Sequence, residues 1–215
     1  MASDPRETDD LLSRASEGDE TALAELFGRY RKRLRRMVRL RLDRRLQGRI
    51  DASDVLQEAF LDLTQQFHSF VERREALPFF LWLRLLTGQR LMRVHRQHLG
   101  AAMRDAGREV SLHRGAMPTA SSESLAARLL GRFTSASEVA VRAERQVKLQ
   151  QALNGMDAID REIIALRHFE ELSNSEVAQV LGLSKAAASN RYVRAMTRLQ
   201  AVLERMPGLL DRPDE

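Results

Sequence analysis

The chain has 215 residues, a net charge of +5 and a sequence pI near 10.3. The basic excess favours a polyanionic partner, and the absence of cysteine excludes disulfides and cysteine-ligated metal sites. The N-terminus, MASDPRETDDLLSR, is polar and acidic where a signal peptide needs a basic and then an apolar run. No stretch reaches the roughly 18 apolar residues of a membrane span. We therefore expect a cytoplasmic protein without membrane insertion.

Helical periodicity runs through the chain and no segment alternates as a strand does, so we predict an all-α fold. The first long helix is expected over residues 20–42. Eleven Arg or Lys residues lie between Arg29 and Arg49, against one acidic residue, Asp43. This basic run fits either a solvated helix face or a surface for a polyanion.

The segment DASDVLQEAFLDL, residues 51–63, reads as a second helix that displays carboxylates within this basic chain. Asp51 can cap its N-terminus and Asp54 occupies the third helical position, as in a capping box. A polar row is expected on the outer face, opposite an apolar stripe. Its members are Asp54, Gln57 and Glu58, with Leu61 and Asp62 alongside. A protein-binding patch and an ordinary solvated surface explain this row equally well.

A loop is expected from about His68 to Leu77, followed by a third helix to about Leu99, because Pro78 suits the first turn of a helix. Residues 101–137 contain three glycines, a proline and the run TASSES, which predict a linker with at most a short helix over residues 125–130. Helical pattern resumes at about residue 138 and continues to residue 206. We therefore expect two small helical domains joined by a long linker.

The segment LSNSEVAQVLGLSKAAASNRYVRAMTRLQAVL predicts a helix-turn-helix. Ser173 and Glu176 form a capping box, Gly182 permits the turn, and Ser184 can cap the second helix. The second helix is expected to enter the major groove of DNA with its N-terminal half facing base edges. The residues expected to contact DNA there are Lys185, Ala186, Ser189, Asn190, Arg191 and Arg194. A helical hairpin with a solvated basic face is the competing interpretation.

Four segments, in order along the chain, resemble the bacterial RNA polymerase sigma factors of the compact extracytoplasmic-function (ECF) group. GDETALAELFGRYRKRLRRMV is similar to their first conserved helix, and DASDVLQEAFLDL resembles their D-A-x-D-hydrophobic-x-Q-E-x-F signature. FFLWLRLLTGQRLMRVHR resembles their F-x-x-W-L-x-x-I-A-x-N segment. DREIIALRHFEELSNSEVAQVLGLSKAAASNRYVRAMTRL resembles their C-terminal promoter-reading domain.

The resemblance implies a division of labour along the chain. Residues 1–100 would be a region 2-like domain that binds core polymerase and melts the upstream promoter element. Residues 101–137 would be the linker, residues 138–206 a region 4-like domain, and residues 207–215 a tail. The implied partners are core RNA polymerase, through its largest-subunit clamp coiled coil and its flap, promoter DNA, and an anti-sigma protein. The chain is expected to act as a monomer on polymerase.

Site residues follow from the matching positions, and the acidic row becomes the polymerase-docking patch. Its expected members are Asp51, Asp54, Gln57, Glu58 and Leu61. The upstream melted element is expected to contact the aromatic helix and the loop before it, because aromatic rings stack on bases and arginines hold a single strand. The positions carried over are Phe70, Trp82, Arg84, Gln89, Arg90 and Arg93. Plain core packing is the alternative for Phe79, Phe80 and Trp82.

The sequence departs from the family pattern at several positions. Gln89 stands where the family has Asn, Arg93 replaces a common Asp, and Thr87 with Gly88 interrupts a segment of good helix formers. The recognition helix carries AAASN in place of a Thr-Val-Lys/Arg-Ser run, and Asp157 replaces a Pro but is itself a good helix cap. These departures leave the promoter sequence unspecified.

Three alternatives complete the expectations. A stand-alone helix-turn-helix regulator predicts duplex binding without polymerase, at a palindromic site. A sigma-like protein that binds polymerase without initiating transcription is the second, and the altered Gln89 and Arg93 region supports it. His95 and His98 could pair on a metal, but a third ligand is missing from nearby sequence. No nucleophile–base pair or phosphate-binding glycine loop is present, so we expect no enzyme activity, metal or cofactor.

Overall fold

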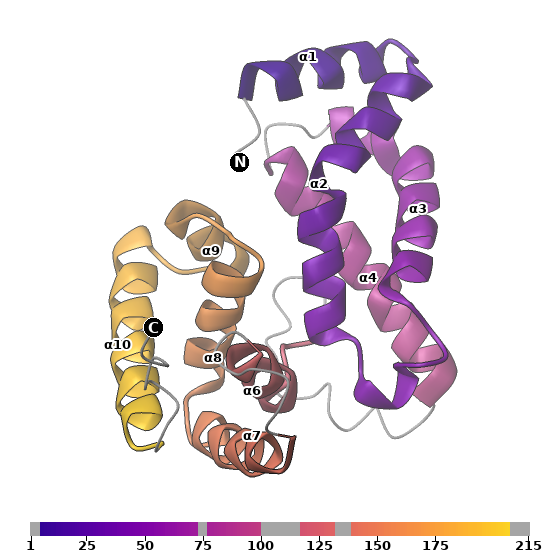
Figure 1. The fold of residues 1–215 in the computed structure, drawn as a ribbon. Helices are drawn as coiled ribbons and strands as arrows, with labels where there is room; N and C mark the ends of the chain where they lie inside the picture. The colour runs from indigo at the N-terminus through magenta and orange to yellow at the C-terminus, as the bar shows by residue number, and fades with distance from the viewer. Residues whose placement is uncertain (1–4, 73–76, 100–116, 132–138, 207–215) are drawn as a thin grey trace, which may run out of the picture. The chain divides into compact units, whose positions relative to one another are not determined.

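The computed structural model describes residues 5–72, 77–99, 117–131 and 139–206, and every regular element in these ranges is helical (Figure 1). The prediction of an all-α fold is confirmed. Two compact units divide the chain, Met1–Pro118 and Thr119–Glu215. Their boundary falls inside the expected linker, most of which lies outside the described residues, as does the tail. None of the described helices is long and apolar enough to cross a membrane.

Unit 1 is built on three helices, each of which contacts the other two: α2 (Glu20–Arg41), α3 (Ala52–Glu72) and α4 (Phe79–Leu99). Asp19 caps α2 by accepting a hydrogen bond from the Ala22 N–H at 3.0 Å. The apolar stripes of the three helices meet in one core. Fully buried members of that core are Leu26, Leu34, Leu56, Leu63, Leu83 and Leu91.

The N-terminal helix α1 (Pro5–Ser16) packs on α2 and is absent from the sequence-based expectations. Most of its residues are polar, and the side of the helix that faces inward carries the buried Leu11 and Leu12. Arg14 forms an ion pair with Asp19, the capping residue of α2, at 2.7 Å. So short an apolar side gives little periodic signal, which explains why the helix was missed.

The expected loop after α3 begins too early, because α3 continues to Glu72. Phe67 and Phe70 extend the buried stripe of the helix by two further positions. The Phe70 ring stacks on the Trp82 ring with centroids 4.6 Å apart, and it also meets Phe79 edge-on at 5.4 Å. Aromatic packing on α4 therefore holds the last turns of α3 in helical form.

Helix α4 runs without a break through Thr87 and Gly88, as the prediction of a helix to about Leu99 requires. The buried Thr87 hydroxyl donates to the carbonyl oxygen of Leu83 at 2.8 Å, within the helix. Gly88 is buried against Met117, and a Cβ at this position would overlap the Met117 Cε. The glycine thus serves a close approach, which outweighs its low helix propensity.

Unit 2 is also helical throughout its described part. Its elements are α6 (Ser122–Leu130), α7 (Val139–Asn154), α8 (Ala158–Ile164), the π-helical turn η5 (Ala165–Phe169), α9 (Asn174–Leu181) and α10 (Lys185–Glu204). Helix α6 packs on α7, and α10 contacts α7, α8 and α9 (Figure 1). Helix α6 contains the short helix expected within the linker, three residues longer at its start. Asp157 caps α8 through the Ile159 N–H at 2.9 Å, as expected.

Candidate functional site

The start of α3 has the capping geometry expected from its sequence. An Asp51 carboxylate oxygen accepts from the Ser53 N–H at 2.7 Å, and an Asp54 carboxylate oxygen accepts from the Asp51 N–H at 2.9 Å. The hydrogen bond from Ser53 is the main cause that lowers the pKa of Asp51. The Asp51 carboxylate is therefore charged at neutral pH, and both side chains are held at the helix N-terminus, where the helix dipole favours negative charge.

The acidic row occupies the exposed face of α3, as expected. Asp54, Gln57 and Glu58 are exposed, and Leu61 lies beside them with 52% of its surface accessible. The carboxylates on this face would repel the phosphates of a nucleic acid. We refer to Asp54, Gln57, Glu58 and Leu61 as the acidic patch.

Asp62 was expected on the outer face beside the patch, and this expectation is wrong. Its side chain is 5% exposed and faces α4, where it receives hydrogen bonds from Arg90 and Arg93. The Arg90 Nε lies 2.9 Å from Asp62 Oδ2, and the Arg93 Nη2 lies 3.1 Å from the same oxygen. Two guanidinium groups compensate the buried carboxylate, which explains why it can leave the surface.

Arg90 connects this buried pair to the acidic patch. Its Nη1 lies 3.2 Å from the Glu58 carboxylate, so one guanidinium serves both Asp62 and Glu58. The hydrogen bond to Asp62 raises the pKa of Arg90, while burial of the guanidinium opposes that rise. Arg90 and Arg93, expected to face the melted promoter, are therefore engaged by carboxylates of α3.

The other residues expected at the upstream element divide by burial. Gln89 is exposed on α4, whereas Arg84 and Phe70 are buried in unit 1. Trp82 is half-buried, and its ring stacks on Phe70. Phe79 and Phe80 are core residues, as the alternative interpretation proposed. Gln89, part of Trp82 and part of Arg93, whose side chain is 38% exposed, therefore present surface that a base could reach.

The helix-turn-helix of unit 2 has the geometry that its sequence predicted. Ser173 Oγ accepts from the Glu176 N–H at 3.2 Å, while the Glu176 carboxylate accepts from the Ser173 N–H at 2.7 Å. Gly182 adopts the left-handed conformation with φ 67°, which favours glycine. Ser184 Oγ caps α10 by accepting from the Ala187 N–H at 3.1 Å. The two helices are therefore begun and ended by local hydrogen bonds.

The N-terminal half of α10 presents an open polar surface. Lys185, Ala186, Ser189, Asn190 and Arg194 are exposed. The Asn174 side chain on α9 donates to the Lys185 carbonyl oxygen at 2.9 Å and fixes the first turn of α10. Val193, which the sequence reasoning missed, belongs to the same surface with 59% exposure. Its spacing of three and four residues from Asn190 and Ser189 was the available signal.

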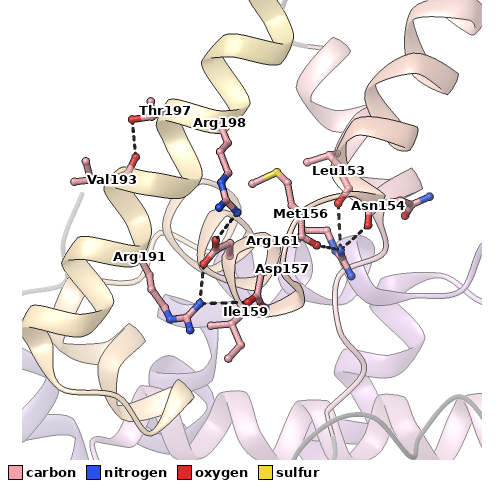
Figure 2. A network of polar contacts seen from close by, with 11 residues as sticks. Leu153, Asn154, Met156, Asp157, Ile159, Arg161, Arg191, Val193, Thr197 and Arg198 are labelled. Atoms are coloured by element: carbon pink, nitrogen blue, oxygen red, sulfur yellow. Dashed lines mark hydrogen bonds and ion pairs between the residues drawn. The ribbon is translucent and has the colours of Figure 1, made fainter.

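Arg191 differs from its neighbours on α10. Its guanidinium lies 3.0 Å from the Asp160 carboxylate and 3.7 Å from that of Asp157. Arg198 reaches the second oxygen of Asp160 at 3.5 Å. Figure 2 shows Arg191 and Arg198 extending from α10 toward the start of α8. The structure thus separates Arg191 from the five exposed residues with which the sequence had grouped it.

Comparisons with known proteins agree with this geometry. Residues 146–199, which include the helix-turn-helix, match the family described as Sigma-70, region 4. The RNA polymerase sigma factor NccH of Alcaligenes xylosoxydans xylosoxydans is 42% identical over 67 residues. That match covers 31% of this chain and 36% of NccH, so the chain spans about a third of the length of the curated relative it matches.

Two solved structures are similar to this chain. CnrH, solved in complex with the cytosolic domain of CnrY, is 21% identical with a TM-score of 0.53, over 92% of this chain and 97% of CnrH. The sigma factor RpoE, solved with the anti-sigma factor NepR from Bartonella quintana, is 20% identical with a TM-score of 0.44, over 88% and 97%. The likeness to CnrH shows the fold. The family match over residues 146–199 agrees with the expected resemblance of this segment to the promoter-reading domain of bacterial RNA polymerase sigma factors.

Proposed function

We propose that the chain is an ECF-type sigma factor, which binds core RNA polymerase and directs it to specific promoters for transcription initiation. The observation that carries the proposal is the region 4 domain, in which a doubly capped helix-turn-helix presents an exposed polar helix. Lys185 supplies charge for phosphates, while Ser189 and Asn190 supply hydrogen bonds for base edges. This division is what a duplex-reading helix requires.

Unit 1 is proposed to hold the polymerase and the upstream element. The acidic patch offers charge and an apolar side chain to a partner protein, which suits the clamp coiled coil of the largest subunit. On α4, Gln89 and the exposed part of Trp82 are the groups available to unstacked bases, because aromatic faces and amides suit a single strand. Arg84 and Arg90 would then support the helix from within, while Arg93 is partly exposed and pairs with Asp62.

The remaining roles follow from this proposal. The chain has no catalytic step of its own, because the polymerase supplies the chemistry and its metal. It acts in the cytoplasm, where the polymerase and the promoter are. CnrH was solved with a protein partner, the cytosolic domain of CnrY, and its likeness of fold supports an anti-sigma partner for this chain as well.

In vitro transcription tests the proposal most directly. Core polymerase is incubated with and without the full chain on a library of fragments from the genome that encodes it. Discrete new transcripts whose templates share two upstream motifs are the expected result. The matched control is a chain with Ser189→Ala and Asn190→Ala, which should bind polymerase normally but lose the upstream-most motif.

Two other results would replace the proposal with a named alternative. Binding to polymerase without any transcript would indicate a sigma-like protein that occupies the enzyme without initiating. Binding to duplex DNA in the absence of polymerase, at a palindromic site, would indicate a stand-alone regulator. Both measurements use the same preparations, so the three functions are separated in one experiment.

A further inference from the structure

A single carboxylate holds α10 at two points. Asp160 has a side chain that is 5% exposed, and its two oxygens face Arg191 at 3.0 Å and Arg198 at 3.5 Å. Arg191 and Arg198 are seven residues apart, which is about two helical turns and roughly 10 Å along the axis. Figure 2 shows both arginines reaching toward α8 from the same side of α10.

Two attachments of this kind constrain a helix more than one does. A single ion pair leaves α10 free to rotate or slide slightly about the contact, whereas a second pair two turns away resists both motions. Breaking the ion pairs of Asp160 is also unfavourable in free energy, because it leaves a buried carboxylate without its cations. Asp160 lies on α8, which is itself anchored to the end of α7 by Arg161, whose Nη1 donates to the Leu153 carbonyl oxygen at 3.1 Å.

We propose that Asp160 is a positioning residue for the recognition helix, and that Arg191 acts through it instead of contacting DNA. The proposal rests on the proposed promoter binding by α10 and assigns the direct contacts to the exposed residues. Arg194 supplies the contrast, because it is exposed and makes no ion pair with any residue that the structure describes. Arg191 and Arg194 lie three residues apart on α10, and we assign them different roles. Arg191 positions the helix, and Arg194 contacts a DNA phosphate.

The experiment measures affinity of the complete complex, core polymerase with the full chain, for a promoter selected by transcription, at several salt concentrations. The variants are Asp160→Asn, Arg191→Gln and their combination, with Arg194→Gln as the matched control. A phosphate contact, once removed, lowers the salt slope by about one. Arg194→Gln should therefore lower the slope, whereas Asp160→Asn and Arg191→Gln should leave it unchanged.

Asp160→Asn and Arg191→Gln should each weaken promoter binding on the order of tenfold, and the double variant should be no weaker than either one. The affinity lost on Asn190→Ala, compared between the Asp160→Asn chain and the wild type, distinguishes a positioning role from a simple loss of stability. Asn190→Ala should cost less affinity in the Asp160→Asn chain than in the wild type, because a helix held loosely presents Asn190 less accurately. Arg198→Gln, which removes only the more exposed arm, should give a smaller loss of the same kind.

Two results would overturn the inference. One is a salt slope that Arg191→Gln lowers as much as Arg194→Gln does. The other is an Asp160→Asn complex with wild-type affinity. If Asp160→Asn fails to fold, as judged by its helical circular dichroism, Arg191→Gln and Arg198→Gln carry the same test. A wild-type complex that selects no promoter fragment contradicts the proposed function itself, whereas a selective wild type with unaffected variants contradicts only the positioning role.

Discussion

Two aspartates of this chain, Asp62 and Asp160, are buried although nothing in their local sequence announces it. Each has a side chain that is 5% exposed, and each receives two arginines from a neighbouring helix. In unit 1 the arginines are Arg90 and Arg93, three apart on α4. Burying a carboxylate is costly unless cations accompany it. Asp62 therefore couples the orientation of α4 to that of α3, and Asp160 couples the orientation of α10 to that of α8.

Replacing Asp62 with Asn should destabilise unit 1 by about 1–3 kcal/mol, because charge-assisted hydrogen bonds are lost. The lower half of that range is expected, since Arg93 is 38% exposed and can be rehydrated. Unfolding in urea, followed by fluorescence of the single tryptophan, Trp82, measures the change in this unit. Glu58→Gln is the control, because its side chain is 53% exposed and should cost less. Equal losses for the two variants would contradict a buried role for Asp62.

His95 predicts how the stability of unit 1 depends on pH. It is 2% exposed, and its Nε2 accepts a hydrogen bond from the Asp43 N–H at 3.2 Å, which requires the neutral ring. Burial lowers the pKa of His95 and the charge of Arg45 adds to this, while the charge of Asp43 opposes it. The unfolded chain therefore binds the proton more tightly than the folded chain does.

The stabilising contribution of neutral His95 should be complete above its ordinary pKa of about 6.5 and should be lost as the pH falls below that value. Urea midpoints from Trp82 fluorescence at about pH 7.5 and 5.5 test this, and His95→Gln should reduce the difference between them. His68 is the matched control, because its side chain is 89% exposed. A His95→Gln chain with the same pH dependence as the wild type would remove the histidine as its cause.

At the level of helices, the sequence-based predictions were correct where local signals determine the structure. Caps and periodicity placed α2 within one residue of its end, and the capping box, Gly182 and Ser184 placed the helix-turn-helix. They failed where packing between distant segments decides. Phe70 prolongs α3 because Trp82 covers it, and Asp62 is buried because α4 brings two arginines. The grouping of Arg191 with exposed residues failed for the same reason, since Asp160 lies 31 residues away in sequence.

The close approach of Met117 to Gly88 gives a prediction about helix α4. Alanine favours helix over glycine by about 1 kcal/mol, but a Cβ here would overlap the Met117 side chain. Gly88→Ala should therefore give less than that gain in the wild type, because Met117 must move. In a Met117→Ala background the obstructing atoms are absent, and Gly88→Ala should stabilise unit 1 by close to the full amount.

The cycle of four chains, measured by urea unfolding with Trp82 fluorescence, isolates the contact between Gly88 and Met117. Gly28 on α2 provides a control, because a Cβ there would meet nothing within 4 Å. Gly28→Ala should stabilise equally with and without Met117. Equal effects of Gly88→Ala in both backgrounds would mean that Met117 does not pack against this glycine.

For the molecule as a whole, charge of opposite sign is allotted to different elements. The chain is basic overall, with a net charge of +5, yet its acidic patch lies on α3 in unit 1, and its exposed recognition surface lies on α10 in unit 2. A uniformly basic surface would bind polyanions without distinction. Unit 1 itself carries both signs, because the basic residues of α2 lie in the same unit as the acidic patch. Under the proposed function, the acidic patch on α3 and the polar surface on α10 would bind a protein partner and a nucleic acid at separate places.

Because the two surfaces lie on different helices, substitutions should remove polymerase binding and promoter binding independently. Replacing Asp54, Gln57 and Glu58 together with Ala should weaken binding to core polymerase by about tenfold or more, with Trp82 fluorescence unchanged. The triple change Thr64→Ala, Gln65→Ala and Gln66→Ala, also exposed on α3 but outside the patch, should leave the affinity unchanged. Titration of labelled core polymerase measures both.

Arg194→Gln should behave in the opposite way, because its side chain belongs to unit 2. It should lower promoter affinity and the salt slope while leaving the affinity for core polymerase as in the wild type. If the acidic-patch variant and its control bind polymerase equally well, the patch is not the docking site. If Arg194→Gln also weakens polymerase binding, the exposed surface of α10 is shared between the two partners, and the separation of the two surfaces on α3 and α10 does not correspond to a division of function.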